Sequence, residues 1–160
     1  MVGWLGSVFG KGGQAALRND EVRDDLSLEQ IEDEYWGEAP ADATRLIRTV
    51  HDVRRKPLGQ LGAEDYRVLL LQQVGVEVLV PRALTQLERE PLWEGDFYPG
   101  DVLSAVLQLP EQYWHAHPDQ LARLSRIVAT LGDATELDAV GAPGGSLRAR
   151  VDEFHHRVGV

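Results

Sequence analysis

The sequence contains no cysteine, which excludes disulfide bonds and metal sites built from thiolates. It also has no apolar run approaching the length that crosses a bilayer, so we expect no membrane partner. Residues 1–13 have no basic residue before their apolar positions and are interrupted by glycines, which is unlike a signal peptide. We therefore expect a soluble cytoplasmic protein, because a chain without cysteine suits a reducing compartment.

Basic residues are scarce in one segment of the chain. The formal net charge is −10, and residues 20–42 hold ten acidic residues against one basic residue, Arg23, so this segment carries 1 − 10 = −9. Phosphate backbones are repelled by such a surface, so we expect no nucleic-acid binding. A basic protein surface is attracted to it, which speeds association. The alternative is an acidic segment that is only solvated by water. Net charge alone does not decide between this alternative and a partner-binding surface.

Apolar residues, 43% of the 160, recur mostly at helical spacing, and proline and glycine separate the helical segments. We predict an all-α fold, a compact irregular bundle of six or seven short helices. The predicted helices cover about residues 27–36, 42–56, 62–75, 76–90, 100–109, 118–131 and 146–158.

Local patterns support individual helices. Ser27 with Gln30 fits a capping box. Residues 76–80, VEVLV, alternate like a strand but have no evident partner strand, so we predict a helix there, with Pro81 marking its first turn or a kink. Asp42 is the predicted cap of the second helix. The apolar stripe of that helix is predicted to face the core and contains Leu46, Ile47, Val50 and Val53.

Glycine and proline are frequent in residues 132–145, which therefore look like a linker. We predict a poorly patterned N-terminal extension over residues 1–26 and a helical domain over residues 27–131. Residues 132–160 are predicted to be the linker plus a C-terminal helix that packs on the same domain.

The histidines occur in two close pairs, His115 with His117 and His155 with His156, whereas zinc sites need three or more convergent ligands. His51 lies near an apolar stripe without an accompanying serine or cysteine motif. We therefore predict no catalytic residue, no metal and no cofactor. A metal-assisted hydrolase is the alternative that a stoichiometric bound ion would support.

Two clusters of aromatic residues lie among carboxylates, one in residues 34–38 and one in residues 93–101. Aromatic residues in connecting segments usually cover the core, but with flanking carboxylates they also resemble interface anchors with a polar rim. We predict that a protein partner contacts these clusters and the acidic residues beside them. The candidate residues are Glu29, Glu32, Asp33, Glu34, Trp36, Glu38, Glu94 and Asp96.

Four segments carry a recognisable pattern: SLEQIEDEYWGEAP (27–40), LIRTVHDVRRKPLGQL (46–61), EDYRVLLLQQVGVEVLVPRAL (64–84) and EPLWEGDFYPGDVLSAVL (90–107). Together they resemble the immunity proteins of contact-dependent growth inhibition systems over residues 27–131. The chain departs from the family pattern at Val76-Glu77, where a glycine-leucine-proline-like turn is expected, and at Gly62, where a Thr or Ser cap is expected. Both departures affect helix boundaries more than function.

The resemblance implies a cytoplasmic protein that acts by stoichiometric binding and not by catalysis. Its partner would be the C-terminal domain of a cognate toxin, in a heterodimer. Such toxins are frequently nucleases, and we infer that the acidic segment would occlude a basic nucleic-acid cleft. The alternative is a helical adaptor or self-associating structural protein, in which Trp4, Phe9 and the helix carrying Phe154 would pack against another copy.

Overall fold

The computed structural model of the chain describes residues 23–160, so Trp4 and Phe9 lie outside the described residues. The described residues form nine α-helices and one 3-10 helix, and their β-structure is limited to an isolated bridge between Ser27 and Pro57. The all-α prediction is confirmed, with two more helices than the seven indicated by sequence. The chain divides into two compact units, Met1–Leu61 (unit 1) and Gly62–Val160 (unit 2). The predicted domain limits at residues 26 and 131 stay predictions.

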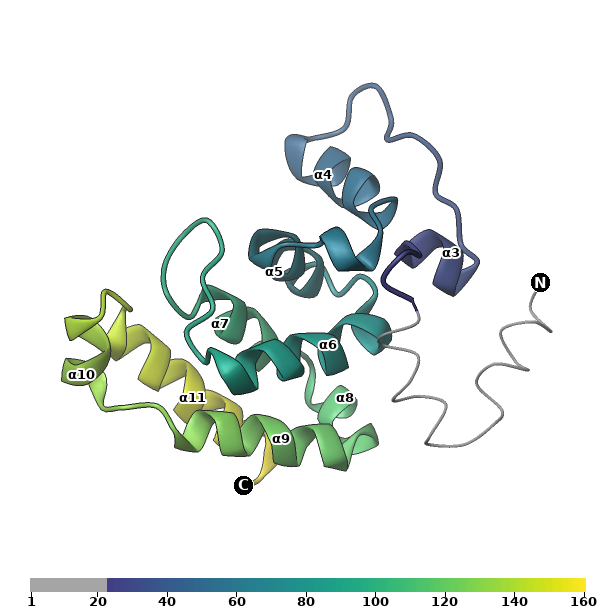
Figure 1. Cartoon of the computed structure of the whole chain (residues 1–160). Coiled ribbons are helices and arrows are strands. Elements are labelled where there is room, and N and C mark those ends of the chain that lie inside the picture. Colours follow the sequence, from purple (N-terminus) through teal and green to yellow (C-terminus); the bar gives the residue numbers. More distant parts are fainter. Residues whose placement is uncertain (1–22) are drawn as a thin grey trace. The chain divides into compact units, whose positions relative to one another are not determined.

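The described part of unit 1 contains α3 (Leu28–Glu32), α4 (Arg45–Arg54) and the 3-10 helix η1 (Leu58–Gln60) (Figure 1). The predicted capping box starts α3, because the Ser27 hydroxyl accepts the Gln30 N–H at 3.4 Å and the Gln30 side chain accepts the Ser27 N–H at 2.9 Å. α3 is shorter than predicted, since Asp33 takes a left-handed backbone conformation with φ 52° and ends it. Thr44, and not the predicted Asp42, caps α4.

The apolar stripe of α4 is only half buried, which corrects the prediction that all of it faces the core. Val50 and Val53 in the C-terminal half are 6% and 4% exposed. Leu46 and Ile47 in the first turn are each 44% exposed. The N-terminal half of α4 therefore presents apolar side chains at the surface.

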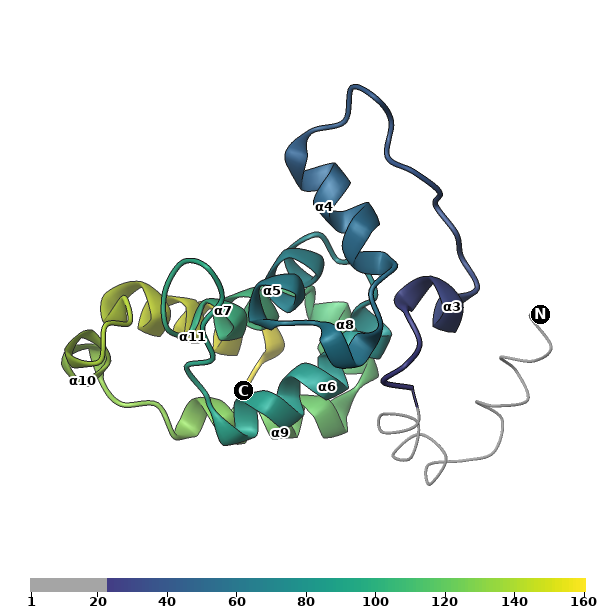
Figure 2. The same cartoon turned by 45° about the horizontal axis from the view of Figure 1, so that its top comes forward.

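Unit 2 contains α5 (Ala63–Leu71), α6 (Val76–Arg89), α7 (Asp101–Leu107), α8 (Glu111–Ala116), α9 (Pro118–Ala129), α10 (Ala134–Ala139) and α11 (Gly144–Val158). α5 and α11 pack against α7, all seven residues of which are buried. α6 runs beside α9, as Figures 1 and 2 show, and also packs on α5. None of the helices within residues 23–160 is long and apolar enough to cross a bilayer.

Polar side chains lie at both ends of the buried helix α7. At its N-terminal end, Asp101 is 3% exposed and accepts backbone N–H groups of the preceding loop. At its C-terminal end, the Arg157 guanidinium donates to the carbonyl oxygens of Leu107 (2.5 Å) and Leu109 (3.2 Å). Helix ends leave backbone groups without partners inside the helix, and Arg157 supplies such a partner at the C-terminal end of α7.

The structure decides three local predictions in unit 2. Residues 76–80 belong to α6, so the choice of helix over strand is correct, and Pro81 lies in the second turn of this continuous helix. α8, which follows Pro110, was not predicted. The linker prediction for residues 132–145 is wrong in part, because α10 lies there and Asp133 and Glu136 cap it through a capping box.

An aromatic contact in the core of unit 2 joins α8 to α11. Trp114 and Phe154 are both 0% exposed and meet edge to face, with ring centroids 5.9 Å apart. The predicted apolar face of the last helix is confirmed, because Leu147 and Val151 are buried on the same side. Phe154 is therefore unavailable for packing against another copy, which corrects the self-association alternative at this residue.

Phe154→Ala should destabilise the protein by about 3–5 kcal/mol, because it removes a fully buried ring and leaves a cavity beside Trp114. Urea unfolding followed by circular dichroism measures this change. His156→Ala, at an exposed position on the same helix, should stay within about 0.5 kcal/mol of the wild type. Equal losses in both variants would contradict the assigned core.

Candidate partner-binding site

The acidic residues of α3 are used within unit 1. Glu29 is 8% exposed, so little of it is open to a partner. Glu32 forms an ion pair with Arg54, with the Oε1 and Nη1 atoms 2.6 Å apart. Glu29 and Glu32, both predicted to contact a partner, are therefore buried or ion-paired within unit 1.

Arg54 connects α4 to the segment that follows α3. Its side chain is 1% exposed, and its guanidinium donates to the Glu32 carboxylate and to the Glu34 carbonyl oxygen, each at 2.6 Å. The same guanidinium lies 4.3 Å from the centre of the Trp36 ring, a cation–π contact. A buried charge is tolerated only with such partners. Arg54 therefore fixes the start of the connection between α3 and α4.

This connection, residues 33–44, is called the acidic loop here, because it holds four carboxylates and no basic residue: Asp33, Glu34, Glu38 and Asp42. Glu34 and Glu38 are exposed, and Asp33 is half-buried. The Glu34 carboxylate accepts a hydrogen bond from the Trp36 indole at 3.2 Å. Trp36 is 38% exposed and meets His51 of α4 edge to face, with centroids 5.3 Å apart. The exposed carboxylates Glu34 and Glu38 thus flank in sequence an aromatic side chain whose position is defined.

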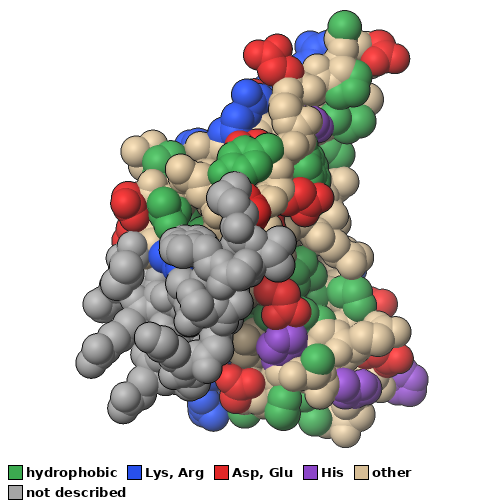
Figure 3. All heavy atoms as spheres, turned by 90° about the vertical axis from the view of Figure 1, so that its right-hand side faces the viewer, with side chains coloured by type: hydrophobic (Ala, Val, Ile, Leu, Met, Phe, Trp, Pro, Cys, Tyr) green, Lys and Arg blue, Asp and Glu red, His purple; other side chains and the backbone are tan. Residues whose placement is uncertain are grey.

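Apolar and basic residues lie close to the acidic loop in unit 1. Tyr35 is 59% exposed, and Leu46 and Ile47 are exposed on α4. Arg45 and Arg48 are also exposed, and Arg48 donates to the Ala41 carbonyl oxygen of the loop at 3.1 Å. Figure 3 shows acidic, basic and apolar side chains together at the top of the view. Apolar side chains within a charged surround are typical of protein interfaces.

The second aromatic cluster lies in the α6–α7 loop, residues 90–100, which carries the predicted contacts Glu94 and Asp96 at exposed positions. The Asp101 carboxylate accepts the N–H groups of Gly95 (2.6 Å), Phe97 (3.1 Å) and Tyr98 (3.4 Å). The remaining N–H of this run, that of Asp96, donates to Glu64 of α5 at 2.9 Å. Four successive backbone amides are therefore held by two carboxylates.

Glu64 is itself held by Arg67, one turn further along α5. The Arg67 Nε and Nη2 atoms donate to the two oxygens of Glu64 at 2.8 Å and 2.5 Å. The hydrogen bond from Arg67 lowers the pKa of Glu64, and the Glu64 carboxylate raises the pKa of Arg67. The Arg67 guanidinium also lies 4.3 Å from the centre of the Phe97 ring.

His51 and His117 have structural partners, and the histidines do not form a cluster that could hold a metal ion within the described residues. His117 lies 2.8 Å from the Glu77 carboxylate and 2.7 Å from the Tyr113 carbonyl oxygen, and its ring stacks on Tyr113. Burial raises the pKa of the Tyr113 phenol. Within residues 23–160, no group of three or more histidine, aspartate or glutamate side chains is placed to hold a metal ion.

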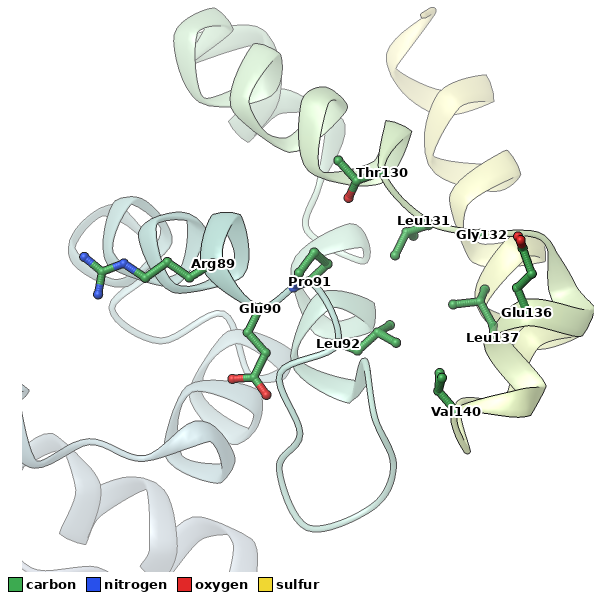
Figure 4. Close-up of a pocket in the computed structure, with 10 residues that line it drawn as sticks. All are labelled: Arg89, Glu90, Pro91, Leu92, Thr130, Leu131, Gly132, Glu136, Leu137 and Val140. Carbon is green, nitrogen blue, oxygen red and sulfur yellow. The ribbon is translucent and has the colours of Figure 1, made fainter.

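Figure 4 shows an open apolar pocket in unit 2, between the end of α6, the α9–α10 connection and α10. Leu92, Leu131 and Leu137 point into it, and Leu137 belongs to a small buried cluster. Glu136, at its edge, accepts the Asp133 N–H of the α10 capping box. Small-molecule sites need a few polar groups that converge on the ligand. The charged lining residues Arg89 and Glu90 point away from the three leucines in Figure 4, so they do not converge on the interior of this pocket.

Acid should weaken the anchoring of the α6–α7 loop. The pKa of Glu64 in the folded state lies below the ordinary value of 4.5, so its contribution to stability is complete above that value and is lost as the pH falls through the folded pKa. Urea unfolding between about pH 7 and pH 3 measures this loss. In Glu64→Gln, the free energy of unfolding should fall less steeply at acid pH than in the wild type. Glu111→Gln, at an exposed position, should show the wild-type fall. An unchanged profile for Glu64→Gln would contradict the anchoring.

Arg54→Ala should release the acidic loop from α4, since it removes the partner of Glu32 and the contact to Trp36. We expect amide hydrogen exchange in residues 33–44 to accelerate by about tenfold or more, the factor that a loss of about 1.4 kcal/mol produces. Arg55→Ala is the matched control, because this neighbouring arginine is exposed. Equal exchange in the two variants would show that Arg54 does not hold the loop.

Comparison with known proteins identifies one family. Residues 30–124 match the family described as CDI immunity proteins, where CDI is contact-dependent growth inhibition. Comparisons with curated proteins and with solved structures gave no significant match. The matched residues include both the acidic loop and the α6–α7 loop. Because the match covers more than half of the chain, the resemblance seen in its sequence is confirmed, and this protein belongs to the family of CDI immunity proteins.

Proposed function

We propose that this immunity protein neutralises a toxin by binding its C-terminal domain one to one in the cytoplasm, without turnover. The family match supports a toxin-neutralising role. The partner in this proposal is the toxin encoded beside the gene of this chain.

The acidic loop is the observation that carries the proposal. It presents Glu34 and Glu38 at the surface on either side of Trp36 in the sequence, and buried Arg54 holds its start in place. A partly exposed aromatic residue with a rim of charges is the composition expected of a binding hot spot. We assign direct contact to Asp33, Glu34, Trp36 and Glu38. Glu32 acts through Arg54, and Glu29 contributes to the fold of unit 1.

We further propose that the toxin is a nuclease. Nucleic-acid clefts are lined with basic residues that neutralise phosphates, so a surface of carboxylates competes for the same groups. Charge attraction of this kind also steers the two proteins together. Arg45 and Arg48 on α4 oppose that attraction, so the contact centres on the acidic loop.

Titration calorimetry with the purified C-terminal domain of the neighbouring toxin tests the binding, and cleavage of RNA and DNA by that domain tests the nuclease assignment. We expect one-to-one binding and loss of cleavage at stoichiometric immunity protein. A toxin that is bound but cleaves neither nucleic acid would overturn the nuclease assignment alone. A toxin domain that is not bound would overturn the proposed function.

Changing Glu34 and Glu38 together to lysine should slow association with the toxin domain by about tenfold or more at low salt, because the attraction becomes repulsion. Surface plasmon resonance at several salt concentrations measures this rate. The matched control changes Asp152 and Glu153 to lysine, which alters the net charge equally at exposed positions on α11. Equal slowing in both variants would mean that overall charge, and not the acidic loop, drives association.

A further inference from the structure

Phe97 at the surface of the α6–α7 loop is the most exposed large hydrophobic side chain among residues 23–160, at 67%. Exposing an aromatic ring to water is unfavourable, and a mobile loop would relieve it by folding the ring inward. This loop is not free to do so, because the N–H groups of residues 95–98 are held by Asp101 and Glu64. The backbone hydrogen bonds of the loop thus hold the Phe97 ring in a solvent-exposed position.

Glycine at two positions makes this loop conformation possible. A Cβ atom at Gly95 would lie 2.6 Å from the Glu64 carboxylate and 3.0 Å from that of Asp101, so a side chain would push the two anchors away. Gly100 has φ +91°, a backbone conformation that favours glycine. The loop is therefore fixed before any partner arrives, which lowers the entropy cost of binding.

The charges around Phe97 specify the kind of partner. Four carboxylates lie in or against residues 94–101 of this region: Glu64, Glu94, Asp96 and Asp101. One guanidinium, that of Arg67, opposes them. The sum is 1 − 4 = −3, and the Arg67 charge is already paired with Glu64. The exposed carboxylates, Glu94 and Asp96, favour a basic partner. A second copy of this chain, which carries −10, would be repelled.

We propose that the α6–α7 loop is a preformed docking element for the toxin domain, with Phe97 as its anchor. This inference rests on the proposed function. Phe97 enters an apolar pocket of the toxin domain, and Glu94 and Asp96 meet basic side chains at the edge of that pocket. The Arg67 guanidinium covers the ring from its own side and sets its orientation. The acidic loop and the α6–α7 loop are then separate contacts to one toxin domain.

The test is the binding of Phe97→Ala to the purified C-terminal domain of the neighbouring toxin, by surface plasmon resonance. We expect dissociation to accelerate about thirtyfold, as for an interface hot spot, with little change in association. Because Phe97 is exposed, urea unfolding should stay at the wild-type value. Val140→Ala, which shortens another exposed apolar side chain of unit 2, should dissociate like the wild type.

A second variant tests the contribution of the Glu94 and Asp96 carboxylates to binding. Glu94→Gln combined with Asp96→Asn removes two carboxylates while the Asp96 amide that donates to Glu64 is kept. This variant should associate several-fold more slowly at low salt and equally fast at high salt. Association that stays at the wild-type rate at low salt would overturn the assignment of a basic edge.

Three outcomes separate this inference from the proposed function. In the first, Phe97→Ala dissociates from the toxin domain at the wild-type rate, while the variant with lysine at positions 34 and 38 associates more slowly. This result would overturn the docking role of the loop and leave the proposed function standing. A toxin domain that the wild-type protein does not bind would overturn both. A dimer of the isolated protein in light scattering that Phe97→Ala abolishes would make a second copy the occupant, which also overturns the inference.

Discussion

The short helix α7 is buried along its whole length, and at its C-terminal end the Arg157 guanidinium supplies a hydrogen-bond partner other than water. Asp101 accepts loop amides before its first turn, and Arg157 donates to the carbonyl oxygens at its end. α5 and α11 then pack on it, so the buried helix organises unit 2. Since Asp101 is the first residue of α7 and its carboxylate accepts amides of the α6–α7 loop, the loop with the most exposed aromatic side chain of the unit is anchored to the start of the buried helix.

Some acidic residues of this protein support the fold, and others lie exposed on loops. The contacts that each carboxylate makes distinguish the two groups. Glu32, Glu64 and Asp101 are bound to arginines or backbone amides and support the fold. Glu34, Glu38 and Asp96 lie on loops that those buried groups hold in place. An acidic surface of this kind is positioned at little entropy cost when a partner binds, because internal ion pairs have already ordered its backbone.

Local signals in the sequence predicted most of the helices, and tertiary contacts account for what they missed. The Ser27 capping box lies within four residues and was found, whereas the same signal at Asp133 and Glu136 was overlooked among neighbouring glycines. Aromatic residues among carboxylates indicated both candidate loops. Arg54 and Glu64 were not recognised as their anchors, because each reaches a partner 22 or 32 residues away in the chain, which no periodic pattern reveals.

The α6–α7 loop is anchored through main-chain N–H groups, which every amino acid except proline supplies. The anchor therefore makes no demand on the identity of the side chains at Glu94, Asp96 and Phe97, whereas Gly95 is constrained by its close neighbours. If the docking role proposed for this loop holds, recognition by side chains and anchoring by the backbone are separable at neighbouring positions. Substitutions at positions 94, 96 and 97 then change the contacts with the toxin domain while the backbone that positions them stays the same.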